Sequence, residues 1–193
     1  VITVSGYEKD RIVEETGLDS SRIEVNYNGF GKEFNESASS PERDYIFFLG
    51  APNPKKNTKG TLEAYARYLD KSERKLPLKI ADLTMDTVIS YLEETGRTDI
   101  AEHIECPGYI SHEELPSTYG KAAAFLYTSL RESFGIPQLE AMACRTPVIV
   151  SNSSALPEVA GPGAILVDPL DPEAISDALI RLETDEEYRL GAI

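Results

Sequence analysis

The chain has 193 residues, of which 41% are hydrophobic and 27% charged, a composition typical of globular proteins and unlike that of disordered or fibrous ones. Its formal net charge is −14, so nucleic acids and anionic lipid surfaces are poor partners for it. The stretch from Thr146 to Pro157 is the longest without a charged residue and is too short to span a bilayer, so no transmembrane segment is expected.

The first forty residues predict a short strand, a helix and a second strand. The run Val1–Val4 is apolar, and Ser5 then precedes a helical stretch over Glu8–Thr16. Residues Arg22–Tyr27 alternate in polarity as a strand does. The polar, proline-terminated stretch Asn35–Pro41 is the best candidate for a linker.

From Tyr45 onward, short apolar strands alternate with amphipathic helices. The predicted strands are Tyr45–Leu49, Leu78–Ala81, Ile104–Tyr109, Ala123–Thr128, Val148–Val150 and Ala164–Val167. The helix signals between and after them are the apolar face of Leu62, Tyr65, Ala66 and Leu69, the stretches Met85–Thr95 and Pro137–Cys144, a capping box over Ser111–Glu114, the pair Asp171-Pro172, and a capping box of Thr184 with Glu187. This alternation predicts an α/β fold with a Rossmann-like, doubly wound parallel sheet. Ligands of such sheets bind in the loops at the carboxyl ends of the strands.

The most informative of these loops follows the strand that ends near Thr128. A glycine-containing loop leads into a helix at Pro137, where backbone amides such as those of Gly135 and Ile136 can bind an anion or sugar hydroxyls. Glu132 lies before this helix, and Glu140 is placed in its first turn. Two carboxylates beside free amides indicate a site for a polyhydroxylated ligand.

Glu132 and Glu140 match the E-x7-E motif of the retaining glycosyltransferases of family 4, also called group 1, which have the two-domain GT-B fold. The chain resembles that family in further segments and in their order. These are Phe48-Leu49-Gly50, Lys55-Lys56-Asn57, Gly108-Tyr109-Ile110-Ser111 and the stretch Ser151–Val159. Because the ordered set covers most of the chain, it is far more specific than the glutamate pair alone.

The resemblance implies a role for each matching residue. Glu132 is the expected catalytic-site carboxylate and, with the loop residues Phe134, Gly135 and Ile136, holds the donor's sugar. Glu140 is expected to bind the ribose hydroxyls, Lys56 the donor diphosphate, Gly50 the phosphates through its loop, and Tyr109 the region of the nucleotide base. A cation is needed at the diphosphate because a domain of charge −14 must reverse its sign locally to hold it.

The implied partners are small molecules and carbohydrates. The donor is expected to be a UDP-, GDP- or ADP-sugar and the acceptor a carbohydrate or a lipid-linked molecule. No Asp-x-Asp motif occurs, and neither His103 nor His112 has a partner at metal-ligand spacing, so no metal and no other cofactor is expected. Two cysteines, Cys106 and Cys144, form no disulfide framework, which favours a cytoplasmic location; contact with a membrane through a further domain is left open.

The resemblance also predicts the domain organisation. Residues 1–40 are expected to be the end of an N-terminal acceptor domain plus the interdomain linker, and residues 41–193 a C-terminal nucleotide-sugar-binding domain that is truncated at its end. The chain would then be the donor-binding portion of an enzyme whose N-terminal domain is missing, and would be inactive alone.

Three departures from the family pattern and one alternative function remain. Ala51 stands where many members have arginine, Arg145 where they have glycine, and Ser153-Ser154 where a Gly-Gly pair is frequent.

Glu158 is interpreted as a helix-start acid, and a contact with the donor is left open. The alternative function is a non-catalytic regulatory module that binds a nucleotide or phosphate without selecting a sugar.

Overall fold

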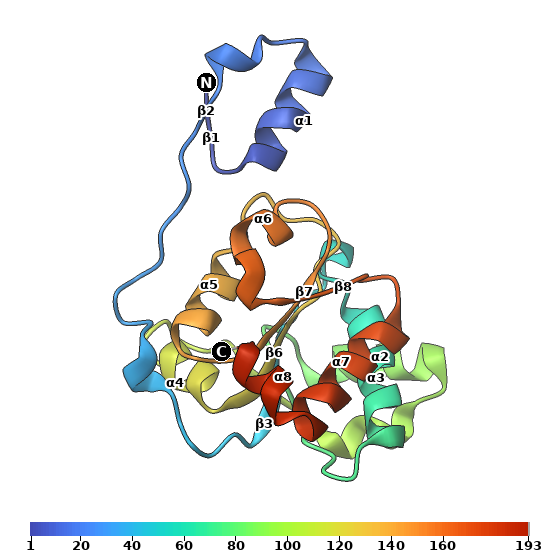
Figure 1. The fold of residues 1–193 in the computed structure, drawn as a ribbon. Helices are drawn as coiled ribbons and strands as arrows, with labels where there is room; N and C mark the ends of the chain where they lie inside the picture. Colours follow the sequence, from blue (N-terminus) through green and yellow to red (C-terminus); the bar gives the residue numbers. More distant parts are fainter. Residues whose placement is uncertain (193) are drawn as a thin grey trace.

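A six-stranded parallel sheet forms the centre of the protein (Figure 1), as seen in a computed structural model that describes residues 1–192. Its strands are β3 (Tyr45–Leu49), β4 (Leu78–Ala81), β5 (Ile104–Gly108), β6 (Ala122–Tyr127), β7 (Val148–Ser151) and β8 (Ile165–Val167). They lie in the order β5-β4-β3-β6-β7-β8, with every neighbouring pair parallel. The predicted doubly wound, Rossmann-like fold is therefore confirmed.

The strand order places a topological switch point between β3 and β6. The chain runs outward from β3 to β5, returns to the middle at β6, and then runs outward on the other side to β8. The loops after β3 and β6 consequently leave the sheet side by side, at the edge where ligands of such sheets bind. This is where the sequence places Lys56 and Glu132.

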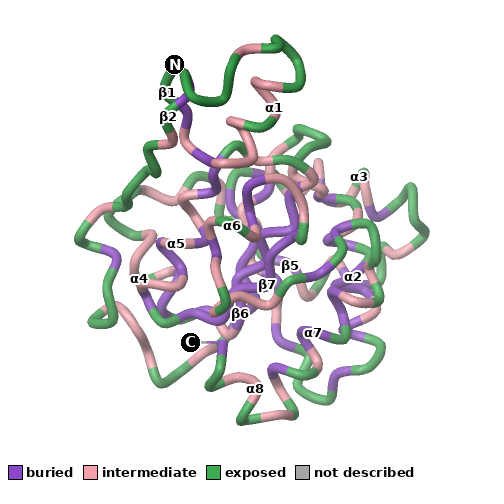
Figure 2. Tube along the Cα trace, turned by 45° about the horizontal axis from the view of Figure 1, so that its top comes forward, coloured by how far each residue is buried: buried purple, intermediate pink, exposed green. Residues whose placement is uncertain are grey.

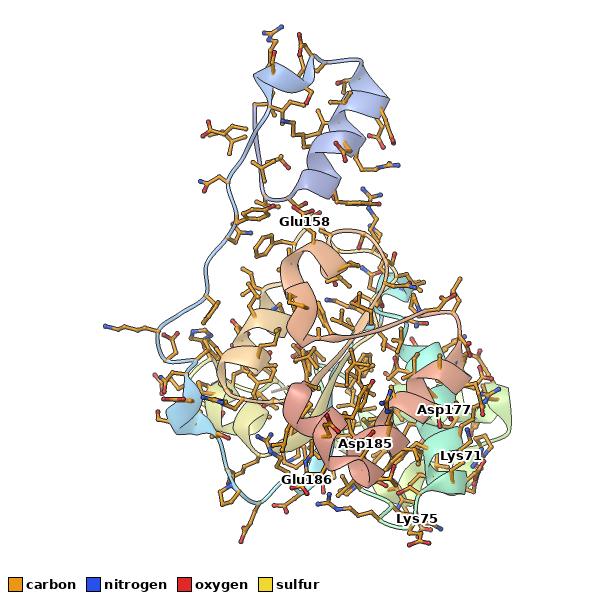
Figure 3. All side chains as sticks on the ribbon, in the orientation of Figure 1. Lys71, Lys75, Glu158, Asp177, Asp185 and Glu186 are labelled. Carbon is orange, nitrogen blue, oxygen red and sulfur yellow. The ribbon has the colours of Figure 1, made fainter. Side chains whose placement is uncertain are left out.

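Helices cover both faces of the sheet. They are α2 (Thr58–Lys71), α3 (Met85–Thr95), α4 (Leu115–Gly120), α5 (Ile136–Ala143), α6 (Leu156–Ala160), α7 (Pro172–Thr184) and α8 (Glu186–Gly191). Helices α2, α3 and α7 pack on one apolar layer, and α4, α5 and α6 on the other. On the surface, Lys71 of α2 pairs with Asp177 of α7 at 2.7 Å (Figure 3), so the two neighbouring helices are also joined outside the core.

Aromatic residues fill both layers. Tyr65 and Tyr68 of α2 are fully buried on one face of the sheet, and Phe47 lies on the opposite face against Phe125, with ring centroids 5.6 Å apart. These four aromatic side chains therefore belong to the hydrophobic core. Figure 2 shows the central strands β6 and β7 as largely buried, whereas the edge strands β5 and β8 are partly exposed.

Residues 1–29 form a small N-terminal unit beside the main body (Figure 1). Strand β1 (Ile2–Thr3) pairs in parallel with β2 (Glu24–Val25), and α1 (Gly6–Thr16) connects them. Helix α1 begins two residues earlier than predicted, because Ser5 accepts a hydrogen bond from the Glu8 amide as its N-cap. Strand β2 is shorter than the predicted second strand, which was expected over Arg22–Tyr27.

Three predicted helix starts need correction. The cap of α8 is Asp185, which accepts a hydrogen bond from the Tyr188 amide, while the Thr184 hydroxyl donates to the carbonyl of Ile180 instead. At α4 the Glu114 carboxylate accepts from the Ser111 amide, but the Ser111 hydroxyl donates to that same carboxylate, so only half of the capping box forms. Third, α5 begins at Ile136, one residue before the predicted Pro137.

No helix within residues 1–192 combines the length and the apolar character needed to cross a membrane.

Candidate functional site

The loops after β3 and β6 are tied to each other at the switch point. The amide of Leu130 donates to the carbonyl of Lys55 at 2.7 Å, and the hydroxyls of Thr61 and Thr128 lie 2.6 Å apart in the buried base of the loops. The hydrogen bond between Leu130 and Lys55 joins the two backbones. It therefore holds the neighbouring side chains of the two loops close together.

Lys56 and Glu132 meet across this junction. The Lys56 ammonium lies 2.7 Å from a Glu132 carboxylate oxygen, and the two side chains are 28% and 21% exposed. The ammonium also lies 5.3 Å from the centre of the Tyr127 ring, whose hydroxyl has its pKa raised by burial and by the charge of Glu132. The residues predicted to hold the diphosphate and the sugar thus form one ion pair, which a ligand can reach.

The two other lysines of the loop do not join this pair. Lys59 forms an ion pair with Glu94, and its ammonium lies 5.1 Å from the ring of Tyr91 on α3. Lys55 is exposed and contributes its backbone carbonyl. Of Lys55, Lys56 and Lys59, it is therefore Lys56 whose ammonium lies at the switch point.

The loop that carries Glu132 is supported by the loop after β7. The amide of Glu132 donates to the Ser154 hydroxyl at 2.9 Å, and the Ser153 hydroxyl donates to the carbonyl of Leu130 at 2.8 Å. Ser154 has φ 55°, in the left-handed region that favours glycine. Ser154, but not Ser153, thus occupies a position that suits glycine, and Arg145, with φ 60°, occupies another.

Helix α5 begins with free amides. Gly135 precedes it with φ 99°, no side chain caps it, and Pro137 has no amide hydrogen. Within residues 1–192 the amides of Phe134, Gly135 and Ile136 have no protein acceptor. These three donors are available to a ligand at the positive end of the helix.

Gln138 is a buried polar residue that sequence reasoning missed. Its amide nitrogen lies 3.4 Å from the carbonyls of both Phe134 and Leu156, so it links the loop before α5 to α6. Its amide oxygen is buried and has no partner within residues 1–192. A glutamine in the first turn of a largely apolar helix was the available signal.

Glu140 lies in the second turn of α5 and not, as predicted, in the first turn. It is the fifth residue of α5, 9% exposed, and accepts a hydrogen bond from the Tyr119 hydroxyl at 3.2 Å. Burial raises the pKa of its carboxyl, which the hydrogen bond from Tyr119 offsets only in part. Glu33 and His112, which sequence reasoning did not place in the site, pair with each other nearby at 2.6 Å. A hydroxyl-rich ligand would supply donors to this carboxylate.

Gly50 and Tyr109 stand apart from the ion pair. Gly50 is buried, its amide donates to the carbonyl of Ala81, and a Cβ there would lie 2.6 Å from the Leu83 side chain. Tyr109 follows the edge strand β5 and is 80% exposed. Their roles stay predictions. Within residues 1–192 no group of three His, Cys, Asp or Glu side chains is arranged to hold a metal ion.

Comparison with known protein families identifies the family of this chain. The family described as "Glycosyl transferases group 1" matches residues 30–192, most of the sequence. The chain belongs to this family. Its resemblance in the E-x7-E segment is thereby confirmed as a family relationship.

Relatives of this group 1 glycosyltransferase chain include two bacterial mannosyltransferases. The O-antigen chain mannosyltransferase B of Escherichia coli is 36% identical over 75% of this chain and 38% of its own length. The O-antigen chain mannosyltransferase RfbU of Salmonella typhimurium is 32% identical over 95% of this chain and 50% of its own length. The chain thus spans half or less of these two relatives.

Solved structures of glycosyltransferases share the fold. Anabaena HepE in complex with UDP and glucose has a TM-score of 0.81 at 17% identity, over 100% of this chain and 56% of its own. WaaG, a glycosyltransferase of lipopolysaccharide biosynthesis, has a TM-score of 0.83 at 13% identity, over 99% of this chain and 55% of its own. At these identities the likeness establishes the GT-B type of architecture and no ligand.

Proposed function

We propose that this chain is the donor-binding portion of a retaining glycosyltransferase that transfers a mannosyl residue from a nucleotide sugar to a carbohydrate or lipid-linked acceptor. The observation that carries the proposal is the Lys56–Glu132 pair at the switch point, beside the unpaired amides that precede α5. The choice of mannose rests on the names of the two relatives.

The proposed donor lies over the loops that follow β3 and β6. Lys56 binds the diphosphate, and the amides of Gly135 and Ile136 assist it. During transfer the bond from the anomeric carbon to the diphosphate oxygen breaks, a bond from that carbon to the acceptor's hydroxyl oxygen forms, and the hydroxyl proton passes to the departing diphosphate. Lys56 stabilises the negative charge that the leaving group gains. No metal ion is needed for that step in this proposal.

Glu132 and Glu140 bind the hydroxyl groups of the donor. Glu132 orients the sugar once the diphosphate has drawn Lys56 away from it. This exchange costs little, because a partly exposed ion pair contributes only about 0–1 kcal/mol. Glu140 accepts from the ribose hydroxyls, and Tyr109 lies beside the base. The binding site for the acceptor and further catalytic groups are supplied by an N-terminal domain outside this chain. The enzyme acts in the cytoplasm.

Exchanging each glutamate for glutamine should separate the two parts of the donor. Glu140→Gln is expected to weaken GDP binding about tenfold, because its partner is the ribose. Glu132→Gln should leave GDP binding unchanged or up to about fivefold tighter, since Lys56 loses a competitor, and should weaken GDP-mannose about tenfold. Titration calorimetry with both ligands measures this. Equal losses for both ligands in both variants would contradict these roles.

A thermal-shift panel of UDP-, GDP- and ADP-sugars tests the function itself, because a ligand that binds the folded state raises its stability. We expect GDP-mannose to give the largest shift, with binding in roughly the high-micromolar to millimolar range and no sugar transfer by the chain alone. If free nucleotides shift the chain as much as every nucleotide sugar does, the regulatory-module function is correct instead.

A further inference from the structure

Glu158 of α6 makes three hydrogen bonds, all with the N-terminal residues 1–29. One carboxylate oxygen accepts from the Gly6 amide at 2.7 Å and from the Tyr27 hydroxyl at 2.7 Å, and the other accepts from the Tyr7 amide at 3.1 Å. Figure 3 shows Glu158 at the top of the main body, directly below the N-terminal unit. This carboxylate therefore joins two parts of the chain that lie more than a hundred residues apart.

The carboxylate completes the cap of α1. The first amides of a helix have no acceptor within it, and a negative charge is favoured at that end. Ser5 accepts from Glu8, while Glu158 accepts from Gly6 and Tyr7. Burial raises the pKa of Glu158, but the hydrogen bonds from Tyr27, Gly6 and Tyr7 outweigh it and hold that pKa below the usual range. Glu158 is thus ionised at neutral pH and suited to this contact.

The remaining contacts of the N-terminal unit fall on the loop that carries Glu132. The Ser5 hydroxyl donates to the carbonyl of Ser133 at 2.8 Å, and the rings of Tyr27 and Phe134 lie 6.0 Å apart. The position of residues 1–29 and the position of the loop Arg131–Phe134 are therefore set together. Because Glu158 remains exposed to solvent, its hydrogen bonds are individually weak, so the contact can open and close.

We propose that Glu158 is a positioning residue that docks residues 1–29 onto the loop Arg131–Phe134 and thereby couples that docking to binding of the donor sugar. The coupling rests on the proposed function, because the same loop holds the sugar there. A docked unit presents Ser133 and Phe134 in one arrangement, so the donor orders less on binding. By linkage, the donor strengthens docking by the same factor.

Hydrogen exchange of the Gly6 and Tyr7 amides tests docking without any ligand. Glu158→Gln preserves the size of the side chain but replaces one acceptor oxygen by an NH₂ group, which cannot accept. We expect both amides to exchange about fivefold faster, or more, in this variant. Glu113→Gln is the matched control, because Glu113 is exposed and makes no ion pair within residues 1–192. Equal exchange in the wild type and in Glu158→Gln would overturn docking by Glu158.

Titration with GDP-mannose and with GDP tests the coupling. GDP-mannose should slow exchange of the Gly6 and Tyr7 amides in the wild type, and Glu158→Gln should weaken GDP-mannose about fivefold while GDP binds as before. If GDP-mannose binds both proteins equally, the coupling is wrong, although docking can still hold. If no nucleotide sugar binds the wild type, the proposed function and the coupling fail together, while amide exchange alone decides the docking.

Discussion

Lys56→Ala is expected to weaken binding of a nucleoside diphosphate by about fivefold to seventyfold. A hydrogen bond between a cation and a phosphate contributes about 1.5–3 kcal/mol, and about 0.5 kcal/mol of this is spent in releasing Lys56 from Glu132, which leaves about 1–2.5 kcal/mol. The loop carrying Lys56 lies at the surface, so the fold should persist. Titration calorimetry with GDP and UDP measures the loss.

Lys55→Ala is the matched control for that measurement. It removes the same charge from the same loop, but its side chain is exposed, the ion pair with Glu132 is made by Lys56, and the backbone carbonyl of Lys55, which accepts from Leu130, is retained. We expect a change of less than about threefold, from long-range attraction alone. Equal effects of the two substitutions would mean that the loop attracts the diphosphate only by its net charge, and that Lys56 holds no special position.

Gly120→Ala is expected to lower the free energy of unfolding by roughly 3 kcal/mol, near the upper end for overpacked sites. A methyl group at Gly120 would overlap the backbone carbonyl of Ala38, in the segment that joins the N-terminal unit to the sheet. The carbonyl of Gly120 also accepts from the Ser40 amide at 3.0 Å. Neither α4 nor the connecting segment around Ala38 can therefore move away without losing this hydrogen bond. Urea denaturation measures the change, and the melting temperature should fall by about 6–12 °C.

Gly29→Ala provides the comparison, because a Cβ there would meet no atom within 4 Å. We expect its free energy of unfolding to stay within about 0.5 kcal/mol of the wild type. If Gly120→Ala is as stable as Gly29→Ala, the segment around Ala38 does not pack on α4 in solution. The stretch Asn35–Pro41, read from sequence as a polar linker, would then be a linker only.

Local patterns were sufficient for the central elements. The strands Tyr45–Leu49 and Leu78–Ala81 and the helix Met85–Thr95 have the bounds that the sequence predicts. Each is bordered by residues with strong local preferences, such as Gly50 and Gly96, so neighbours in the chain decide where it ends. Where two capping residues compete, as Thr184 and Asp185 do, local patterns did not separate them.

The sequence by itself determined the family, the succession of strands and helices along the chain, and the kinds of side chain that follow β3 and β6. Those properties depend on residues that are close together in the chain. Only the tertiary structure decided that Lys56 contacts Glu132, 76 residues away, and that Glu158 caps α1, more than 150 residues away. Each contact requires the strand order that sets β3 beside β6 and brings α6 up to the N-terminal unit. No periodicity in the sequence encodes such a distance, because it results from how whole elements pack.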